Sequence, residues 1–129
     1  RKIEIEDIVS ACGVDDVHKV DAFDIAAVEE TYKKAFAYDG PSVVIVEGPC
    51  YFVGTGAGPA YSVDTQTCIA CGTCFKLGCP AIKHAAERNE RTGRPKSAID
   101  PVLCVGCDMC AQVCPVDAIK APLDTEERG

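Results

Sequence analysis

Apolar positions repeat at helical spacing in two stretches of the first fifty residues. One stretch covers residues 5–12, and Gly13 is placed to end it, since glycine readily adopts the backbone conformation that follows many helices. The other covers residues 24–40, with Asp24 where an N-cap is expected. The apolar positions are Ile5, Ile8 and Val9 in the first, and Ile25, Val28, Tyr32, Ala35 and Phe36 in the second. We therefore predict two helices.

Two shorter runs of β-branched residues predict strands. Val17–Val20 gives a short strand, and the unbroken apolar run Ser42–Val46 is typical of a strand buried on both faces of a parallel sheet. The order helix, strand, helix, strand predicts that residues 1–50 are the C-terminal fragment of an α/β domain. Two strands do not form a stable sheet covered on both faces, and the sequence starts at Arg1 without Met. We therefore expect the rest of this domain to lie upstream.

Residues 51–62 are rich in glycine and proline, and we predict them to be a linker. Its glycines do not have the G-x-G-x-x-G spacing of a nucleotide-binding loop. Residues 63–121 form the second predicted domain and contain a duplication. The segment VDTQTCIACGTC, from Val63, aligns with IDPVLCVGCDMC, from Ile99, at an offset of 36 residues, and each copy continues to Cys-Pro and Ala-Ile. Residues 122–129 are expected to be a polar tail.

Eight of the ten cysteines fall into two tight groups, which points to metal binding. The second copy has the full bacterial C-x2-C-x2-C-x3-C-P pattern, in which the fourth cysteine ligates the other of two iron–sulfur clusters. The first copy has one more residue before its fourth cysteine, and Gly78 is placed to accommodate it. The pattern predicts two [4Fe-4S] clusters. The expected ligands are Cys68, Cys71, Cys74 and Cys114 for one cluster, and Cys104, Cys107, Cys110 and Cys79 for the other.

The residues around the cysteines carry two further expectations. Pro80 and Pro115 follow the fourth cysteine of each copy, and we expect them in the first turn of a helix, where a missing N–H costs little. Apolar side chains would shield the clusters from water, and burial helps to set their reduction potentials. The paired candidates are Ile69 and Val105, with Ile82 and Ile119.

Zinc and disulfides are the alternative uses of these cysteines. Structural zinc sites use pairs of C-x2-C motifs, and a third cysteine at the same spacing in both copies has no role there. A disulfide scaffold would normally be shorter, with scattered cysteines. The pattern therefore favours iron–sulfur clusters. Cys12 and Cys50 lie outside both motifs. Cys12 is expected to pack as a free thiol, and Cys50 is expected to pack or to have a loop role rather than to bind metal. His18 and His84 have no evident carboxylate or cysteine partner and are expected in surface or structural roles.

Charge and hydropathy exclude some partners. The formal net charge of −7 argues against nucleic acid. No stretch approaches the roughly 20 apolar residues of a membrane span, and none resembles a signal peptide, so we expect a soluble cytoplasmic protein. Four basic residues gather between the cysteine groups: Arg88, Arg91, Arg94 and Lys96. We interpret them as a solvated hairpin. The alternative is a docking patch for another subunit or an acidic ferredoxin.

Together these motifs resemble a known family. CIACGTCFKLGCPAI and CVGCDMCAQVCPVDAI resemble a two-cluster bacterial-type ferredoxin domain, and the upstream IEDIVSACGVDDVHKVDAFD and SVVIVEGPC resemble the end of a thiamine-diphosphate domain. This order, with the longer first spacing, is similar to the C-terminus of the alpha subunit of indolepyruvate:ferredoxin oxidoreductases. The resemblance implies an α+β ferredoxin-like two-[4Fe-4S] domain, preceded by an α/β fragment that is the tail of a parallel-sheet domain.

The resemblance also implies a function. Such enzymes decarboxylate a 2-oxoacid, an arylpyruvate in this branch, on thiamine diphosphate, pass electrons singly through the clusters to ferredoxin, and form acyl-CoA and CO2. The thiamine-phosphate and magnesium motif, GDG followed by Asn, is absent from this chain, so both cofactors would bind mainly upstream. These residues would form only the electron-transfer part, with no catalytic residue of their own.

The implied partners are the remainder of the alpha subunit, the beta subunit, an external ferredoxin, CoA and the 2-oxoacid. A stand-alone ferredoxin-like carrier or an iron–sulfur subunit of another oxidoreductase is the alternative, and a purely structural metal domain is a third. A simple carrier has no use for a buried parallel strand such as Ser42–Val46.

Overall fold

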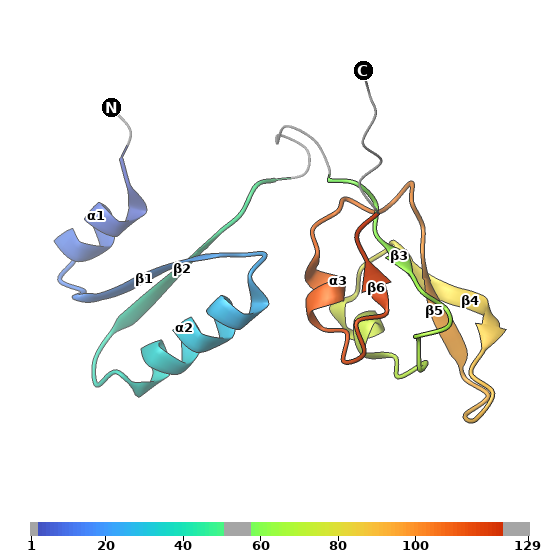
Figure 1. Cartoon of the computed structure of the whole chain (residues 1–129). Coiled ribbons are helices and arrows are strands. Elements are labelled where there is room, and N and C mark those ends of the chain that lie inside the picture. Colours follow the sequence, from blue (N-terminus) through green and yellow to red (C-terminus); the bar gives the residue numbers. More distant parts are fainter. Residues whose placement is uncertain (1–2, 51–57, 123–129) are drawn as a thin grey trace, which may run out of the picture. The chain divides into compact units, whose positions relative to one another are not determined.

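The computed structural model describes residues 3–50 and 58–122 (Figure 1). The chain divides into two compact units, Arg1–Pro49 and Cys50–Gly129. In these described segments, no helix is long and apolar enough to cross a membrane.

The first unit contains a two-stranded parallel sheet with helices packed on it. Along the chain, its elements are α1 (Ile5–Ala11), β1 (Asp16–Asp21), α2 (Ile25–Ala37) and β2 (Ser42–Glu47). Strands β1 and β2 pair in parallel over their full length. Helix α2 contacts both strands and α1 contacts β1, as Figure 1 shows for α2. The two helices and two strands predicted from the sequence are thereby confirmed.

Local hydrogen bonds explain where the helices begin and end. The carboxylate of Asp24 accepts the backbone N–H of Ala27 at 2.9 Å, which confirms the predicted N-cap of α2. The N–H of Gly13 donates to the carbonyl of Ser10 at 2.9 Å and ends α1. The ammonium of Lys19 on β1 lies 3.1 Å from a carboxylate oxygen of Glu6 on α1 and 2.9 Å from one of Glu47 on β2. Lys19 therefore joins α1 to β2.

Burial of β2 is less complete than its sequence predicts. Ile45 is buried, but the next residue, Val46, is 42% exposed. The expectation of a strand covered on both faces is therefore not met within this chain, because two strands and their helices leave part of the sheet uncovered. Helix α1 buries none of its residues, and Ile5 and Ile8 are both more than half exposed.

The described residues of the second unit form two small antiparallel sheets and two short helices. Its elements are β3 (Ser62–Val63), the 3-10 helix η1 (Thr73–Leu77), β4 (Ile82–Arg88), β5 (Pro95–Ile99), α3 (Met109–Gln112) and β6 (Ile119–Lys120). Strand β3 pairs with β6, and β4 pairs with β5. The tip of the β4–β5 hairpin contains the RTGR segment, as expected for a hairpin.

The strand pairs interleave the two copies of the duplicated segment. Val63 at the start of the first copy faces Ile119 at the end of the second, and Ile82 at the end of the first faces Ile99 at the start of the second. Ile82 and Ile119 are buried, and together with Cys74 and Cys110 they form the core of this unit. Each copy is therefore completed by the other rather than folding as a separate half.

Two expectations about loops need correction. Residues 58–62 do not behave as a free linker, because the N–H of Gly58 donates to the carbonyl of Val105 at 3.0 Å and β3 begins at Ser62. Residues 51–57 of the expected linker and residues 123–129 of the expected tail lie outside the described residues. Pro80 and Pro115 begin turns, not helices, because a strand starts within four residues of each proline and leaves no room for a helix.

Candidate metal centres

The eight motif cysteines line two separate cavities in the second unit. The first cavity contains Cys68, Cys71, Cys74 and Cys114. The second cavity contains Cys79, Cys104, Cys107 and Cys110. Each cavity thus receives three cysteines from one copy and the fourth from the other copy. These are the same two sets of four that the motif pattern groups, although ligation itself stays a prediction.

Apolar side chains line both cavities, whose volumes differ. The cavity volume is about 20 Å³ in the first and about 210 Å³ in the second. Ile69 and Ile119 lie in the wall of the first cavity, and Ile82 and Val105 lie in that of the second, beside the cysteines they were expected to shield.

Left-handed residues turn each cysteine loop around its cavity. In the first copy Ala70 and Gly72 flank the middle cysteine, with φ of +57° and +80°. Their counterparts in the second copy, Gly106 and Asp108, both have φ of +69°. Positive φ is uncommon for residues with a side chain, so its repetition at equivalent places indicates that the loop path is the same in both copies.

The inserted residue of the first motif is accommodated beside its fourth cysteine. Gly78 ends η1 with φ of +67°, and its N–H donates to the carbonyl of Phe75 at 3.1 Å. The corresponding residue of the second copy, Val113, ends α3 in a right-handed conformation. Gly78 is the glycine that the sequence indicated for this role.

Two aspartates position the first cysteine of each loop. The carboxylate of Asp64 accepts the N–H of Gln66 at 2.9 Å, and that of Asp100 accepts the N–H of Val102 at 3.0 Å. Hydrogen bonds from Thr67 and Gln66 hold the pKa of Asp64 below its usual range, and the Lys83 ammonium is the main cause of the lowered pKa of Asp100. Sequence reasoning missed both residues, although an aspartate four positions before the first cysteine in each copy was the available signal.

The sulfur atoms interact with polar groups and with one another. The sulfur of Cys114 accepts the N–H of Ala118 at 3.3 Å. A hydrogen bond from the Thr73 side chain is the main cause of the lowered pKa of Cys71. Burial, together with the negative charges of Cys107, Cys104 and Cys79, raises the pKa of Cys110 to about 11. Thiols that oppose one another's ionisation in this way need a bound cation to stay together as thiolates.

This donor set fits an iron–sulfur cluster. Each cavity offers four thiols, which is the ligand set of a [4Fe-4S] cube. In residues 3–50 and 58–122, no three side chains of His, Cys, Asp or Glu are grouped closely enough to hold a single metal ion. Four thiols around one cavity suit a cluster that spreads its sulfur ligands over several irons.

The remaining candidate residues are not among those that line either cavity. Cys12 is exposed, so the expectation that it packs in a core is wrong; α1, which Cys12 follows, has no buried residue. Cys50 is also exposed and lies outside the helices and strands, so of the two roles expected for it the loop role fits and packing does not. His18 does have a carboxylate partner, since its Nε2 lies 3.0 Å from Asp16, two positions earlier on the same face of β1. Period-two spacing on a strand was the missed signal. His84 is exposed and stacks on Phe75, which suits the surface role expected of it.

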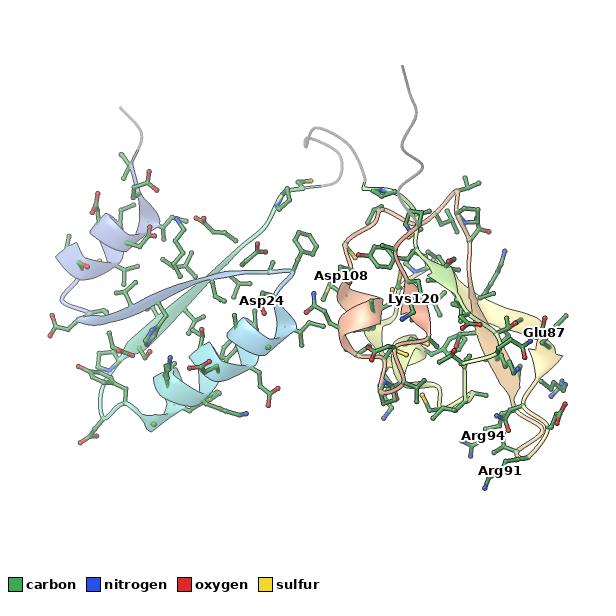
Figure 2. The ribbon with its side chains drawn as sticks, viewed as in Figure 1. Asp24, Glu87, Arg91, Arg94, Asp108 and Lys120 are labelled. Carbon is green, nitrogen blue, oxygen red and sulfur yellow. The ribbon has the colours of Figure 1, made fainter. Side chains whose placement is uncertain are left out.

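The basic residues of the β4–β5 hairpin serve different purposes. The Arg88 guanidinium donates to the carbonyl of Gly93 at 2.8 Å and closes the turn, and the Lys96 ammonium donates to the carbonyl of Thr65 at 2.6 Å. Arg91 and Arg94 are exposed at the hairpin tip (Figure 2). The predicted solvated hairpin agrees with this arrangement.

Comparison with known proteins places the second unit in a family. The family described as a 4Fe-4S dicluster domain matches residues 61–121. Ferredoxin-3 from Nostoc is 32% identical over 68 residues, which cover 43% of this chain and 70% of that protein. The chain belongs to the 4Fe-4S dicluster ferredoxin family. Because this match includes the two cysteine motifs, the second unit is a ferredoxin-type domain.

The ferredoxin-type domain and the unit before it are also found together in larger proteins. The indolepyruvate oxidoreductase subunit IorA of Pyrococcus abyssi is 39% identical over 128 residues, which cover 93% of this chain and 19% of that protein. IorA of Methanothermobacter marburgensis is 40% identical over 120 residues, covering 92% of this chain and 18% of that protein. The chain thus spans about a fifth of the length of these curated relatives and is homologous to their C-terminal part.

Proposed function

We propose that the chain carries electrons through two [4Fe-4S] clusters, one in each cavity. Cys68, Cys71, Cys74 and Cys114 would hold the first cluster, and Cys79, Cys104, Cys107 and Cys110 would hold the second. The observation that carries this proposal is that each cavity collects four thiols, three from one copy and one from the other. The match to the 4Fe-4S dicluster domain supports it independently.

The protein's own residues would hold and shield the clusters. Left-handed turns aim three cysteines of a loop at one cavity, and the pairing of β3 with β6 and of β4 with β5 brings the fourth cysteine across. Apolar side chains limit the access of water, which favours one-electron transfer over hydrolysis of the cluster. Each cluster, when bound, supplies one site that gains or loses a single electron.

We further propose that this electron path belongs to a thiamine-dependent 2-oxoacid:ferredoxin oxidoreductase acting on indolepyruvate or another arylpyruvate, with acyl-CoA and CO2 as products. The alignment of 93% of the chain with IorA supports this assignment. The partners would be the rest of the alpha subunit, the beta subunit, CoA and an external ferredoxin, in the cytoplasm. Thiamine diphosphate and Mg²⁺ would bind mainly upstream.

The first unit would be the end of the thiamine-diphosphate domain. Its two parallel strands and the exposed apolar residues of α1 and β2 are what the edge of a larger α/β domain exposes when the neighbouring segments are missing. Among these exposed residues are Ile5, Ile8 and Val46. They would be covered by the preceding part of the same subunit.

The test is the metal content and redox behaviour of the protein purified without oxygen. We expect about eight irons and eight sulfides per chain, from two four-iron clusters, and a brown absorption that dithionite bleaches. A colourless protein with stoichiometric zinc contradicts the cluster proposal. Reducible clusters in a full-length protein that does not oxidise arylpyruvates with CoA would instead support the carrier alternative.

A further inference from the structure

A serine hydroxyl lies against one of the motif cysteines. The Oγ of Ser97 on β5 lies 3.2 Å from the Sγ of Cys74 in the first cavity. Both residues are buried, with 4% of Ser97 and 7% of Cys74 exposed. A buried hydroxyl needs a hydrogen-bond partner, and the sulfur of Cys74 is the partner that the structure gives to Ser97.

The direction of this hydrogen bond follows from the chemistry of the sulfur. Once Cys74 is a thiolate bound to iron, it has no proton to give and acts only as an acceptor. The hydroxyl of Ser97 must then donate. A donated hydrogen bond stabilises the more negative, reduced form of a cluster more than the oxidised form, so it raises the reduction potential.

The second cavity has a different residue at the equivalent place. The offset of 36 residues relates Ser97 to Tyr61 and Cys74 to Cys110, and Tyr61 lines the second cavity with Cys110. The Tyr61 hydroxyl is hydrogen-bonded to the carboxylate of Asp108, which lines the same cavity. The Tyr61 hydroxyl therefore donates its hydrogen bond to a carboxylate. The negative charge of Asp108 opposes the addition of an electron to a cluster in the second cavity.

We propose that Ser97 tunes the first cluster through its hydrogen bond to Cys74, and that the Ser97/Tyr61 difference gives the first cluster a higher reduction potential than the second. This inference rests on the proposed pair of clusters. Ser97 is a positioning residue, since it would act on the first cluster only through the sulfur of Cys74. The duplicated domain would therefore offer two unequal sites for an electron.

The experiment is an EPR-monitored redox titration of the holoprotein, with Ser97→Ala compared to wild type. We expect the higher of the two midpoint potentials to fall, with a change of about tenfold in the reduction equilibrium, equivalent to about 59 mV for one electron. The lower potential stays unchanged. Ser97→Thr keeps a hydroxyl and should keep the wild-type potential, and Tyr61→Phe should leave the higher potential unchanged.

Distinct outcomes would overturn the inference and the proposed function. Two intact clusters whose higher potential does not move in Ser97→Ala, or whose lower potential moves instead, refute the role of Ser97. Absence of clusters from the wild-type protein refutes the proposed function itself. If Ser97→Ala does not retain its first cluster, the wild-type protein decides: its reduced higher-potential cluster must show hyperfine coupling to a hydroxyl proton that exchanges in D2O, and absence of that coupling refutes the hydrogen bond.

Discussion

Asp64 and Asp100, 36 positions apart, make the same contacts at the entrance to the two cysteine loops. The backbone carbonyl of each accepts the N–H of the first cysteine of its loop at 3.0 Å. The N–H of each donates across to the other copy, to the carbonyl of Ala118 at 2.7 Å for Asp64 and of Ala81 at 2.8 Å for Asp100. These two aspartates therefore fix the loops locally and also join the copies.

The aspartates give the domain a dependence on pH that can be measured. The pKa of each carboxyl is lower in the folded chain than its unfolded value of about 3.9. Their contribution to stability is therefore full above pH 4 and is lost as the pH falls through the folded pKa. We expect the double variant Asp64→Asn/Asp100→Asn to lose its visible absorption faster than wild type at pH 7, with the difference shrinking in strong acid. An equal ratio of the two rates at every pH would contradict this prediction.

Exchange of single cysteines should separate the two ligand sets. Cys114→Ser should alter the same EPR signal as Cys68→Ser, although Cys114 belongs to the second motif. Cys79→Ser should alter the other signal, in common with Cys104→Ser. The measurement is the EPR spectrum of each reduced variant. If Cys114→Ser instead disturbs the signal that Cys104→Ser disturbs, each motif holds its own cluster and the crossed assignment is wrong.

Gly106, in the second cysteine loop, should tolerate alanine less well than Gly72, in the first cysteine loop. A Cβ at Gly106 would lie 2.6 Å from the backbone of Gly58, whereas nothing lies within 4 Å of a Cβ at Gly72. Both positions have positive φ, so each substitution costs about 1–2 kcal/mol from backbone strain. Gly106→Ala should cost about 1–3 kcal/mol more, because the segment at Gly58 must move. Urea unfolding followed by cluster absorbance measures both, and equal losses would show that residues 58–60 are not held against this loop.

The N-cap of α2 gives a prediction for the first unit. Asp24→Ala removes the acceptor of the Ala27 N–H and should lower the free energy of unfolding by about 1 kcal/mol. Figure 2 shows Asp24 at the start of this helix. Asp24→Asn keeps a side-chain acceptor and serves as the matched control. Far-UV circular dichroism during urea unfolding reports the difference, and an alanine variant as stable as the asparagine variant would show that the cap contributes nothing.

Periodic features of the sequence were the most informative about the fold. Helical spacing and β-branched runs predict the elements of the first unit, because residues 3.6 or two apart share a face whatever surrounds them. The duplicated cysteine motif predicts which cysteines line one cavity, because the fourth cysteine of the C-x2-C-x2-C-x3-C-P pattern belongs with the three cysteines of the other copy. Residues 58–62 were misjudged because Gly58 is held by a backbone contact to Val105, which composition does not reveal.

Contacts between distant side chains were beyond the sequence. Ser97 reaches Cys74 from a strand that lies 23 residues further along the chain, and nothing in the composition of β5 marks that serine. The turns at Pro80 and Pro115 were also missed, since proline at the second position of a turn and at the start of a helix has the same fixed φ. The strand that follows each turn decides between the two.

The interleaved pairing of β3 with β6 and of β4 with β5 bears on how such a protein arose. In a half-length chain with one copy of the motif, the same crossed pairing would need a dimer of identical chains, each lending its last strand to the other. A duplication would then join two subunits that already depend on each other, and the turn between β4 and β5 is the connection that makes such a pair a single chain.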